Sequence, residues 1–121
     1  MKLYEFNQNN TGGGFDVDDK VCHRVVVEAK DEQEAIRIAE NLGCYWDGVA
    51  NGMDCECCGD RWYESPSEID LKSVKESYKE DFSNLDEYFQ FMADYWGWTK
   101  PDIRVFYKDG TVKEIFSKKI K

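Results

Sequence analysis

The segment Cys55-Glu56-Cys57-Cys58-Gly59 places three cysteines within four residues. Cys55 and Cys58 form a C-x-x-C-G pattern, in which one tight turn points both sulfurs at a metal ion and the glycine relieves the turn. A tetrahedral zinc site needs four ligands, so this knuckle supplies half of one. The other ligands would come from the remaining thiols and the single histidine, namely Cys22, His23, Cys44 and Cys57.

Two interpretations of these cysteines remain open: structural zinc that organises the surrounding segment, or reduced thiols packed in a turn. The chain has five cysteines and no signal-peptide apolar stretch at its start, which disfavours a full disulfide framework. Catalytic zinc would need an open position with a placed base, and redox dithiols normally begin a helix. Gly59-Asp60-Arg61 is not a helix start, so the sequence predicts a protein that is not an enzyme.

A second chemically useful group, Asp60-Arg61-Trp62-Tyr63, follows the thiols directly. It combines a carboxylate, a guanidinium and two aromatic faces, and arginine and tryptophan are enriched at binding hot spots. We expect the thiols to hold the segment so that Arg61 and Trp62 face outward. The alternative is that Trp62 and Tyr63 cover the core beneath an irregular loop.

Both groups lie in segment 44–64, which shows neither strand nor helix periodicity and contains three glycines. A loop of this length in a small domain is typical of functional or metal-organised segments. Before it, the pattern predicts strands at 3–6 and 21–29, joined by a glycine-rich connection over 7–14. In the second strand His23 shares the expected core face with the valines, where a histidine usually packs with one hydrogen bond. A helix follows, from a capping box at Asp31 and Glu34 to Gly43.

After the loop, Ser65-Pro66-Ser67-Glu68 predicts a helix start, and the apolar spacing continues to Phe82. Ser83 or Asn84 caps a further helix that ends at Gly97. We expect the apolar stripe of this helix to belong to the core; it consists of Leu85, Tyr88, Phe89, Met92, Tyr95 and Trp96. Asp109-Gly110 predicts the turn of a closing β-hairpin over 103–107 and 111–116.

The resulting order, β-β-α-loop-α-α-β-β, predicts one α+β domain over residues 1–121 with an irregular cysteine-rich loop at 44–64. We expect a mostly antiparallel sheet with the helices packed on one face. A chain of 121 residues and 14.2 kDa accommodates one hydrophobic core.

Sixteen basic and 25 acidic side chains give a net charge of −9, which disfavours nonspecific nucleic-acid and anionic-lipid binding. The acidity is concentrated in residues 1–66, which hold 14 acidic and 6 basic side chains. No apolar run approaches the roughly 20 residues that cross a bilayer. The sequence therefore predicts a cytoplasmic protein that does not associate with membranes.

Four segments together resemble a family of small proteins encoded by tailed bacteriophages: residues 1–10, 22–24, 57–63 and 110–115. They contain Met1-Lys2-Leu3-Tyr4-Glu5-Phe6-Asn7-Gln8-Asn9-Asn10, Cys22-His23-Arg24, Cys57-Cys58-Gly59-Asp60-Arg61-Trp62-Tyr63 and Gly110-Thr111-Val112-Lys113-Glu114-Ile115. The resemblance spans most of the chain and is weakest over 66–84. That family has no assigned activity, so the resemblance implies a setting, the cytoplasm of an infected bacterium.

Three functional hypotheses follow. The first is a non-catalytic phage accessory protein that binds a host or phage protein through loop 44–64 and its acidic surroundings. The second is a binder of a small nucleotide-like anion, held by Arg61, Trp62 and Tyr63. The third is a DNA mimic that presents carboxylates as phosphate surrogates.

Overall fold

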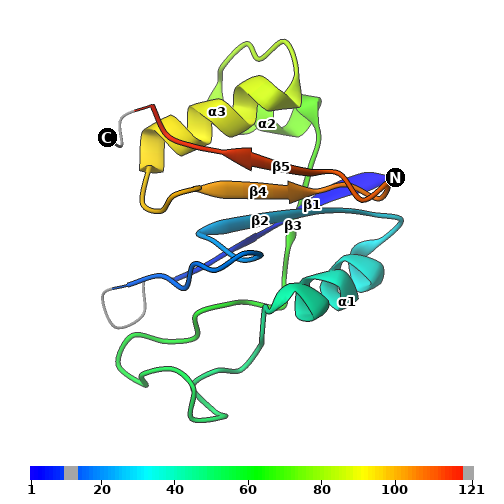
Figure 1. Cartoon of the computed structure of the whole chain (residues 1–121). Coiled ribbons are helices and arrows are strands. Elements are labelled where there is room, and N and C mark those ends of the chain that lie inside the picture. Colours follow the sequence, from blue (N-terminus) through cyan, green and yellow to red (C-terminus); the bar gives the residue numbers. More distant parts are fainter. Residues whose placement is uncertain (10–13, 119–121) are drawn as a thin grey trace.

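The computed structural model describes residues 1–9 and 14–118, so part of the predicted glycine-rich connection lies outside the described residues. The elements follow one another along the chain as shown in Figure 1: β1 (Lys2–Asn7), β2 (Arg24–Ala29), α1 (Glu32–Leu42), β3 (Ser67–Ile69), α2 (Leu71–Tyr78), α3 (Leu85–Trp96), β4 (Ile103–Phe106) and β5 (Val112–Ile115). Among the helices described, none combines the length and apolar character that crossing a membrane requires.

The five strands form one sheet in the order β3-β1-β2-β4-β5. Each neighbouring pair is antiparallel except β2 and β4, which run parallel with Arg24 opposite Ile103 and Val27 opposite Phe106. The prediction of a small α+β domain with a mostly antiparallel sheet is confirmed. The parallel pair makes the sheet mixed.

The helices cover both faces of the sheet, so the expectation that they share one face is wrong. Val25 and Val27 of β2 belong to the core cluster on the α1 side, together with Ala35. Val26 belongs to the other cluster, which contains Phe89 of α3. Side chains along a strand alternate between faces, and all three valines are fully buried. A central strand buried on both faces requires a layer on each side, as Figure 1 shows.

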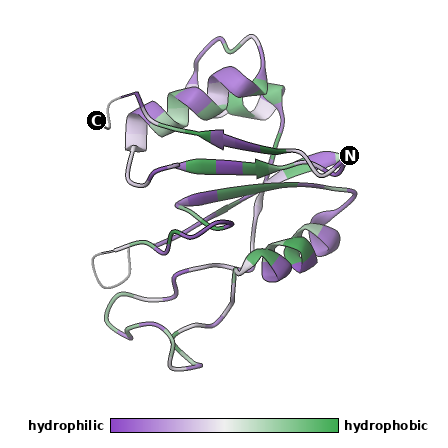
Figure 2. Ribbon diagram, viewed as in Figure 1, coloured by the Kyte–Doolittle hydropathy of each residue, from purple (hydrophilic) through white to green (hydrophobic). Residues whose placement is uncertain are grey.

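Local signals set the ends of α1 and α3 as predicted. The Asp31 carboxylate accepts from the Glu34 amide at 2.8 Å and begins α1. The Asn84 side-chain oxygen accepts from the Glu87 amide and begins α3. Gly97 ends that helix at a φ of 57°. In Figure 2 hydrophobic and hydrophilic residues alternate along α1 and α3, as they do in helices with one buried side.

The helix predicted to start at Ser65 is wrong. Residues 67–69 form β3, which pairs with β1 through Leu3 opposite Ile69. Asp70, not Ser65, caps α2, and that helix ends at Tyr78 before it reaches Phe82. Without β3 the outer edge of β1 would expose a row of unpaired backbone groups. Pairing of residues 67–69 with β1 therefore outweighs the local helix signal.

A buried ion pair joins the sheet to α3. Arg24 Nη1 donates to Glu5 Oε2 at 3.1 Å, and the Tyr88 hydroxyl donates to Glu5 Oε1 at 3.2 Å. Burial raises the pKa of the Tyr88 hydroxyl, so it stays a donor. The Arg24 guanidinium also lies 5.8 Å from the Trp96 ring centroid. The Tyr88 contact holds the start of α3 to the sheet, and the Trp96 contact holds its last turn.

We expect Arg24→Met to lower the free energy of unfolding by about 3–5 kcal/mol, because it leaves the Glu5 carboxylate buried without its cation. Urea unfolding followed by circular dichroism measures the change. Arg37→Met, at an exposed position of α1, is the matched control and should change stability by no more than about 0.5 kcal/mol. Equal, small losses for both variants would contradict the structural role of the pair.

Candidate metal centre and exposed aromatic strip

Loop 44–64 contains no helix or strand, as predicted, and carboxylates hold it in shape. Asp54 accepts from the Tyr45 hydroxyl and from the Arg61 amide, each at 2.9 Å. Asp60 accepts from the Val49 amide at 2.9 Å. Asp60 was predicted to serve binding, and its carboxylate bonds within the loop instead. These bonds replace the backbone ladders that the loop lacks.

Cys55, Cys57 and Cys58 lie together at an exposed turn of this loop. The Cys58 and Gly59 amides donate to the Cys55 carbonyl at 3.2 and 3.0 Å, and Gly59 adopts a φ of 86° that favours glycine. The Cys57 sulfur lies 2.7 Å from that of Cys55 and 3.6 Å from that of Cys58. All three sulfurs lie within 4.8 Å of one another, so this group could bind a metal ion.

Hydrogen bonds within the turn separate the acidities of two of these thiols. The Cys57 thiol and nearby backbone amides stabilise the Cys55 thiolate and lower the pKa of Cys55. Hydrogen bonding with the Cys55 and Cys58 side chains raises the pKa of Cys57 to about 11. Cys55 is therefore the first of the two to ionise as the pH rises.

The other predicted ligands do not join this group. Cys22 and Cys44 are buried, and burial raises the pKa of each thiol to about 12. The Cys22 thiol donates to the Arg24 carbonyl at 3.2 Å. Within residues 1–9 and 14–118, the structure brings together only the three exposed thiols as candidate ligands. Cys57, which lies inside the C-x-x-C pattern of Cys55 and Cys58, is the third thiol of this group.

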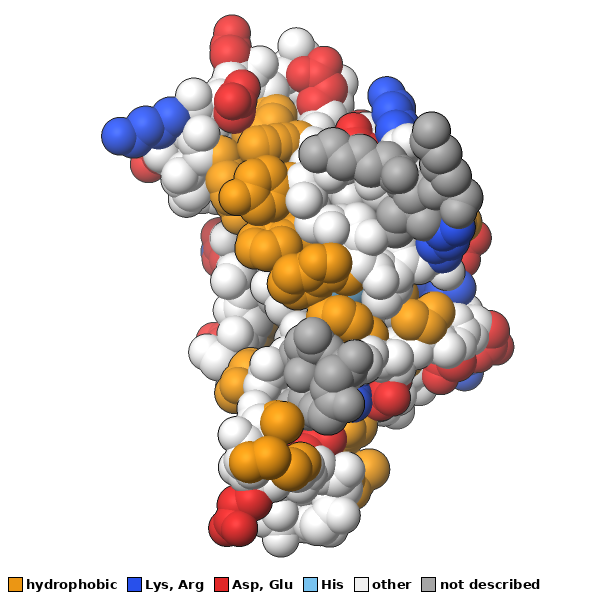
Figure 3. All heavy atoms as spheres, turned by 90° about the vertical axis from the view of Figure 1, so that its left-hand side faces the viewer, with side chains coloured by type: hydrophobic (Ala, Val, Ile, Leu, Met, Phe, Trp, Pro, Cys, Tyr) orange, Lys and Arg blue, Asp and Glu red, His pale blue; other side chains and the backbone are white. Residues whose placement is uncertain are grey.

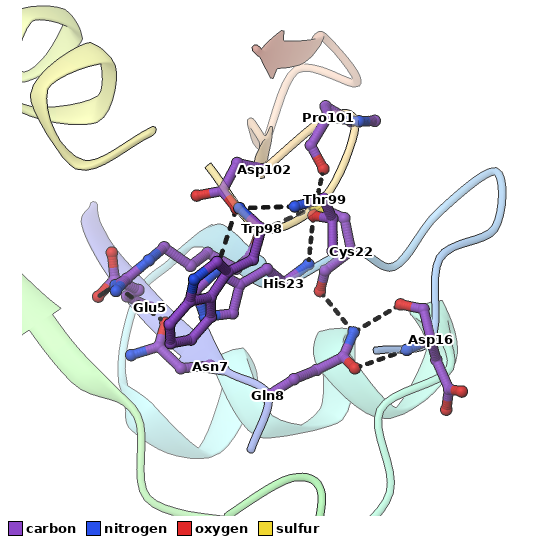
Figure 4. A network of polar contacts seen from close by, with 11 residues as sticks. Glu5, Asn7, Gln8, Asp16, Cys22, His23, Trp98, Thr99, Pro101 and Asp102 are labelled. Carbon is purple, nitrogen blue, oxygen red and sulfur yellow. Dashed lines mark hydrogen bonds and ion pairs between the residues drawn. The ribbon is translucent and has the colours of Figure 1, made fainter. Parts of the chain in front are cut away.

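His23 directly precedes β2, the central strand, and its side chain is buried. Its Nδ1 lies 3.1 Å from Asp102 Oδ1, which also accepts from the Trp98 amide at 3.1 Å (Figure 4). The ring is held between Phe15 and Trp98, with centroid distances of 4.9 Å to each. The expectation of a histidine packed with one hydrogen bond is confirmed.

The Arg61 side chain turns inward, against the expectation that it faces a partner. Its Nη1 donates to Gln8 Oε1 at 3.1 Å and to the Gly14 carbonyl at 2.9 Å. Its Nε lies 3.3 Å from Asp16 Oδ2, and 13% of the side chain is exposed. Arg61 therefore ties loop 44–64 to the segment that follows β1.

Trp62 is also internal, at 1% exposure, whereas Tyr63 is 53% exposed. The cluster that contains Trp62 includes Ala35 and Ala39 of α1. Because α1 presents small side chains to this core, a large ring from the loop fills the space. The expectation of an outward Trp62 is wrong, and the alternative that it covers the core is correct.

Aromatic side chains at the end of α3 and beside it form an exposed surface that the sequence analysis missed. We call it the aromatic strip and define it as Tyr78, Phe91, Tyr95, Trp96 and Trp98. Tyr95 is 65% exposed, Trp98 50% and Trp96 36%, although Tyr95 and Trp96 were assigned to the core. Neighbouring rings contact one another, with centroids 5.0 Å apart for Tyr95 and Trp96 and 4.7 Å apart for Trp96 and Trp98.

Figure 3 shows a hydrophobic band running along this face of the molecule. A pocket of about 220 Å³ lies in the strip, lined by Tyr78, Phe91, Met92, Tyr95 and Trp96. The signal in the sequence is the density of aromatic residues over 95–98. Successive helical positions point about 100° apart, so adjacent rings there cannot all enter one core.

We expect Trp62→Ala to lower the free energy of unfolding by about 3–5 kcal/mol, because it removes a large ring from the α1-side core. Tyr63→Ala, its exposed neighbour, should change stability by no more than about 0.5 kcal/mol. Urea unfolding of both variants measures the difference. Similar effects at the two positions would contradict the placement of Trp62.

Alkylation of the native, reduced, metal-free protein should modify the exposed turn, with Cys55 reacting before Cys57, and should spare the buried Cys22 and Cys44. At about pH 8 the two buried thiols stay protonated because their pKa values are raised, and only thiolates react. Mass spectrometry of the peptides measures the modification at each site, and the unfolded protein should react at every cysteine. Modification of Cys22 or Cys44 at the rate of the exposed thiols would contradict the structure.

Comparison with curated proteins and with solved structures gave no match. A family model matches residues 1–121. The match therefore spans the described fold, the aromatic strip and turn 55–59, which we call the thiol turn. The chain belongs to the family described as a domain of unknown function, DUF7296.

Proposed function

We propose that this chain is a small acidic phage accessory protein that binds a host or phage protein in the bacterial cytoplasm without catalysing a reaction. The aromatic strip is the binding surface. The observation that carries this proposal is a continuous set of exposed rings, of which Tyr95, Trp98 and Tyr78 are each more than 40% exposed. The bacteriophage setting rests on the resemblance of the sequence segments described above.

The chemistry of the strip suits protein recognition. Exposed apolar groups gathered in one place mark interaction sites more often than scattered ones do. Tyrosine and tryptophan dominate binding hot spots because each buries a large area while losing few rotatable bonds. Three of the rings lie on α3, and Arg24 lies against Trp96 from the sheet side. The strip is therefore formed before a partner arrives, which lowers the entropic cost of binding.

The size of the pocket and the charge of the chain indicate the kind of partner. A pocket of about 220 Å³ is smaller than the roughly 300–1,000 Å³ that enclose small-molecule ligands. It fits an apolar side chain that projects from a protein surface. Acidic side chains flank the upper part of the hydrophobic band in Figure 3, and the chain carries a net charge of −9. The partner we propose presents this apolar side chain among basic residues.

The other two hypotheses have weaker support. A nucleotide-like anion would need the Arg61 guanidinium, which already bonds Gln8 and Gly14 and pairs with Asp16. Trp62, its expected stacking partner, is buried. A DNA mimic needs an outward row of carboxylates, whereas Asp54 and Asp60 turn inward to loop amides.

For the three exposed thiols we propose Zn²⁺ as the bound ion. Thiolates select zinc among the divalent ions that a reducing cytoplasm offers, and zinc tolerates the crowded turn because it imposes no d-electron geometry. Zinc would fix turn 55–59 within a loop that has no secondary structure of its own. This zinc binding is separate from the proposed use of the aromatic strip.

Tyr95→Ala tests the proposed surface, because Tyr95 is the most exposed member of the strip and its ring contacts Phe91 and Trp96, which belong to the strip as well. The matched control is Tyr63→Ala, which removes an exposed ring from loop 44–64. Tagged wild type and both variants are used to capture proteins from infected cells, and the dissociation constant of the purified partner is then measured for each.

We expect the Tyr63→Ala protein to retain the partner and the Tyr95→Ala protein to bind it about 30-fold more weakly, as for a hot-spot residue. Binding should also weaken as the salt concentration rises, since the partner is basic. If Tyr63→Ala lost the partner and Tyr95→Ala kept it, the binding surface would be the loop and the proposal would be overturned.

A further inference from the structure

We propose that the zinc ion at the thiol turn keeps one coordination position open to a ligand from outside the chain. The ligand class is a monodentate nitrogen or sulfur donor, such as an imidazole or a thiolate. This inference rests on the zinc binding proposed above and deepens it. A ligand from outside the chain can bind at the fourth coordination position, which a closed structural site does not allow.

The geometry fits three sulfurs on one ion. A Zn–S distance of about 2.3 Å puts two sulfurs of a tetrahedral site about 3.8 Å apart. The sulfurs of Cys57 and Cys58 already lie 3.6 Å apart, and no pair in the group exceeds 4.8 Å. Cys55 and Cys57 are closer, at 2.7 Å, and both side chains are exposed and free to rotate apart. A single ion can therefore bind all three with small side-chain movements.

No fourth side chain of the kinds that bind zinc lies with the three thiols in residues 1–9 and 14–118. Among the residues that the structure describes, no histidine, aspartate, glutamate or further cysteine joins the three thiols. The segments outside the described residues contain only Asn, Thr and Gly at 10–13 and Lys and Ile at 119–121. Three protein ligands with a fourth position held by water or another molecule is the arrangement of open zinc sites.

The turn is supported from its backbone side, which leaves the sulfurs accessible. Asn9 Nδ2 donates to the Cys58 carbonyl at 2.8 Å and to the Asp60 carbonyl at 3.3 Å. The Asn9 amide also donates to the Arg61 carbonyl at 2.7 Å. These bonds fix the turn to the end of β1, while the three cysteine side chains remain exposed. The open position of a bound ion therefore faces solvent.

The test uses Co²⁺ as a spectroscopic substitute for zinc in the full reduced chain, in two steps. In the first, Co²⁺ and then Zn²⁺ are titrated into the wild type and into Cys55→Ser, Cys57→Ser and Cys58→Ser proteins, with Cys44→Ala as the control. We expect one ion per chain, and an affinity at least about tenfold lower for each of the three serine variants, because each removes a direct ligand. The control should bind as the wild type does.

In the second step, imidazole and, separately, 2-mercaptoethanol are added to the cobalt-loaded wild type. We expect each to change the visible cobalt spectrum, and native mass spectrometry of the zinc form should show one added ligand per chain. A spectrum unchanged by both reagents, with one ion bound, would overturn the open position and leave zinc binding intact. No bound ion would overturn zinc itself, and wild-type affinity in Cys57→Ser would overturn the three-thiolate site.

Discussion

Burial of β2 on both faces is the constraint on which the rest of the structure depends. Val25, Val26 and Val27 are all fully buried, so the sheet needs a helical layer on each side. The chain places α1 on one face and then crosses to the other, where α2 and α3 pack (Figure 1). Loop 44–64 and β3 make that crossing, and β3 closes the edge of β1 on the way. The thiol turn and the aromatic strip are consequences of this path.

The crossing determines which side chains are available for recognition. The loop has no backbone ladder, so carboxylates and a guanidinium from within it supply the missing bonds, and Trp62 anchors it in the core. Residues that form a typical recognition set in the sequence are therefore used for structure. The exposed aromatic surface falls at the end of α3, where Tyr95 is 65% and Trp98 50% exposed.

The sequence predicted the features that depend on near neighbours. Asp31, Asn84 and Gly97 act within one helical turn, and their roles are confirmed. The parallel pairing of β2 with β4 and the strand at β3 depend on segments far apart in the chain, so no local pattern specified them. The run of valines in β2 did carry a signal, since continuous β-branched residues are typical of a strand buried on both faces. Trp62 could not be placed, because its burial depends on small side chains in α1. Among the described residues, the candidate metal ligands that come together are Cys55, Cys57 and Cys58, which span four positions of the sequence.

The proposed partner binds at the aromatic strip and leaves loop 44–64 exposed. Hydroxyl-radical footprinting of the chain, alone and in complex with its purified partner, measures this directly at each side chain. We expect labelling of Tyr95 and Trp98 to fall in the complex, while labelling of Tyr63 and Met53, both exposed on loop 44–64, stays as in the free chain. Protection of Tyr63 and Met53 with no change at Tyr95 and Trp98 would contradict this expectation.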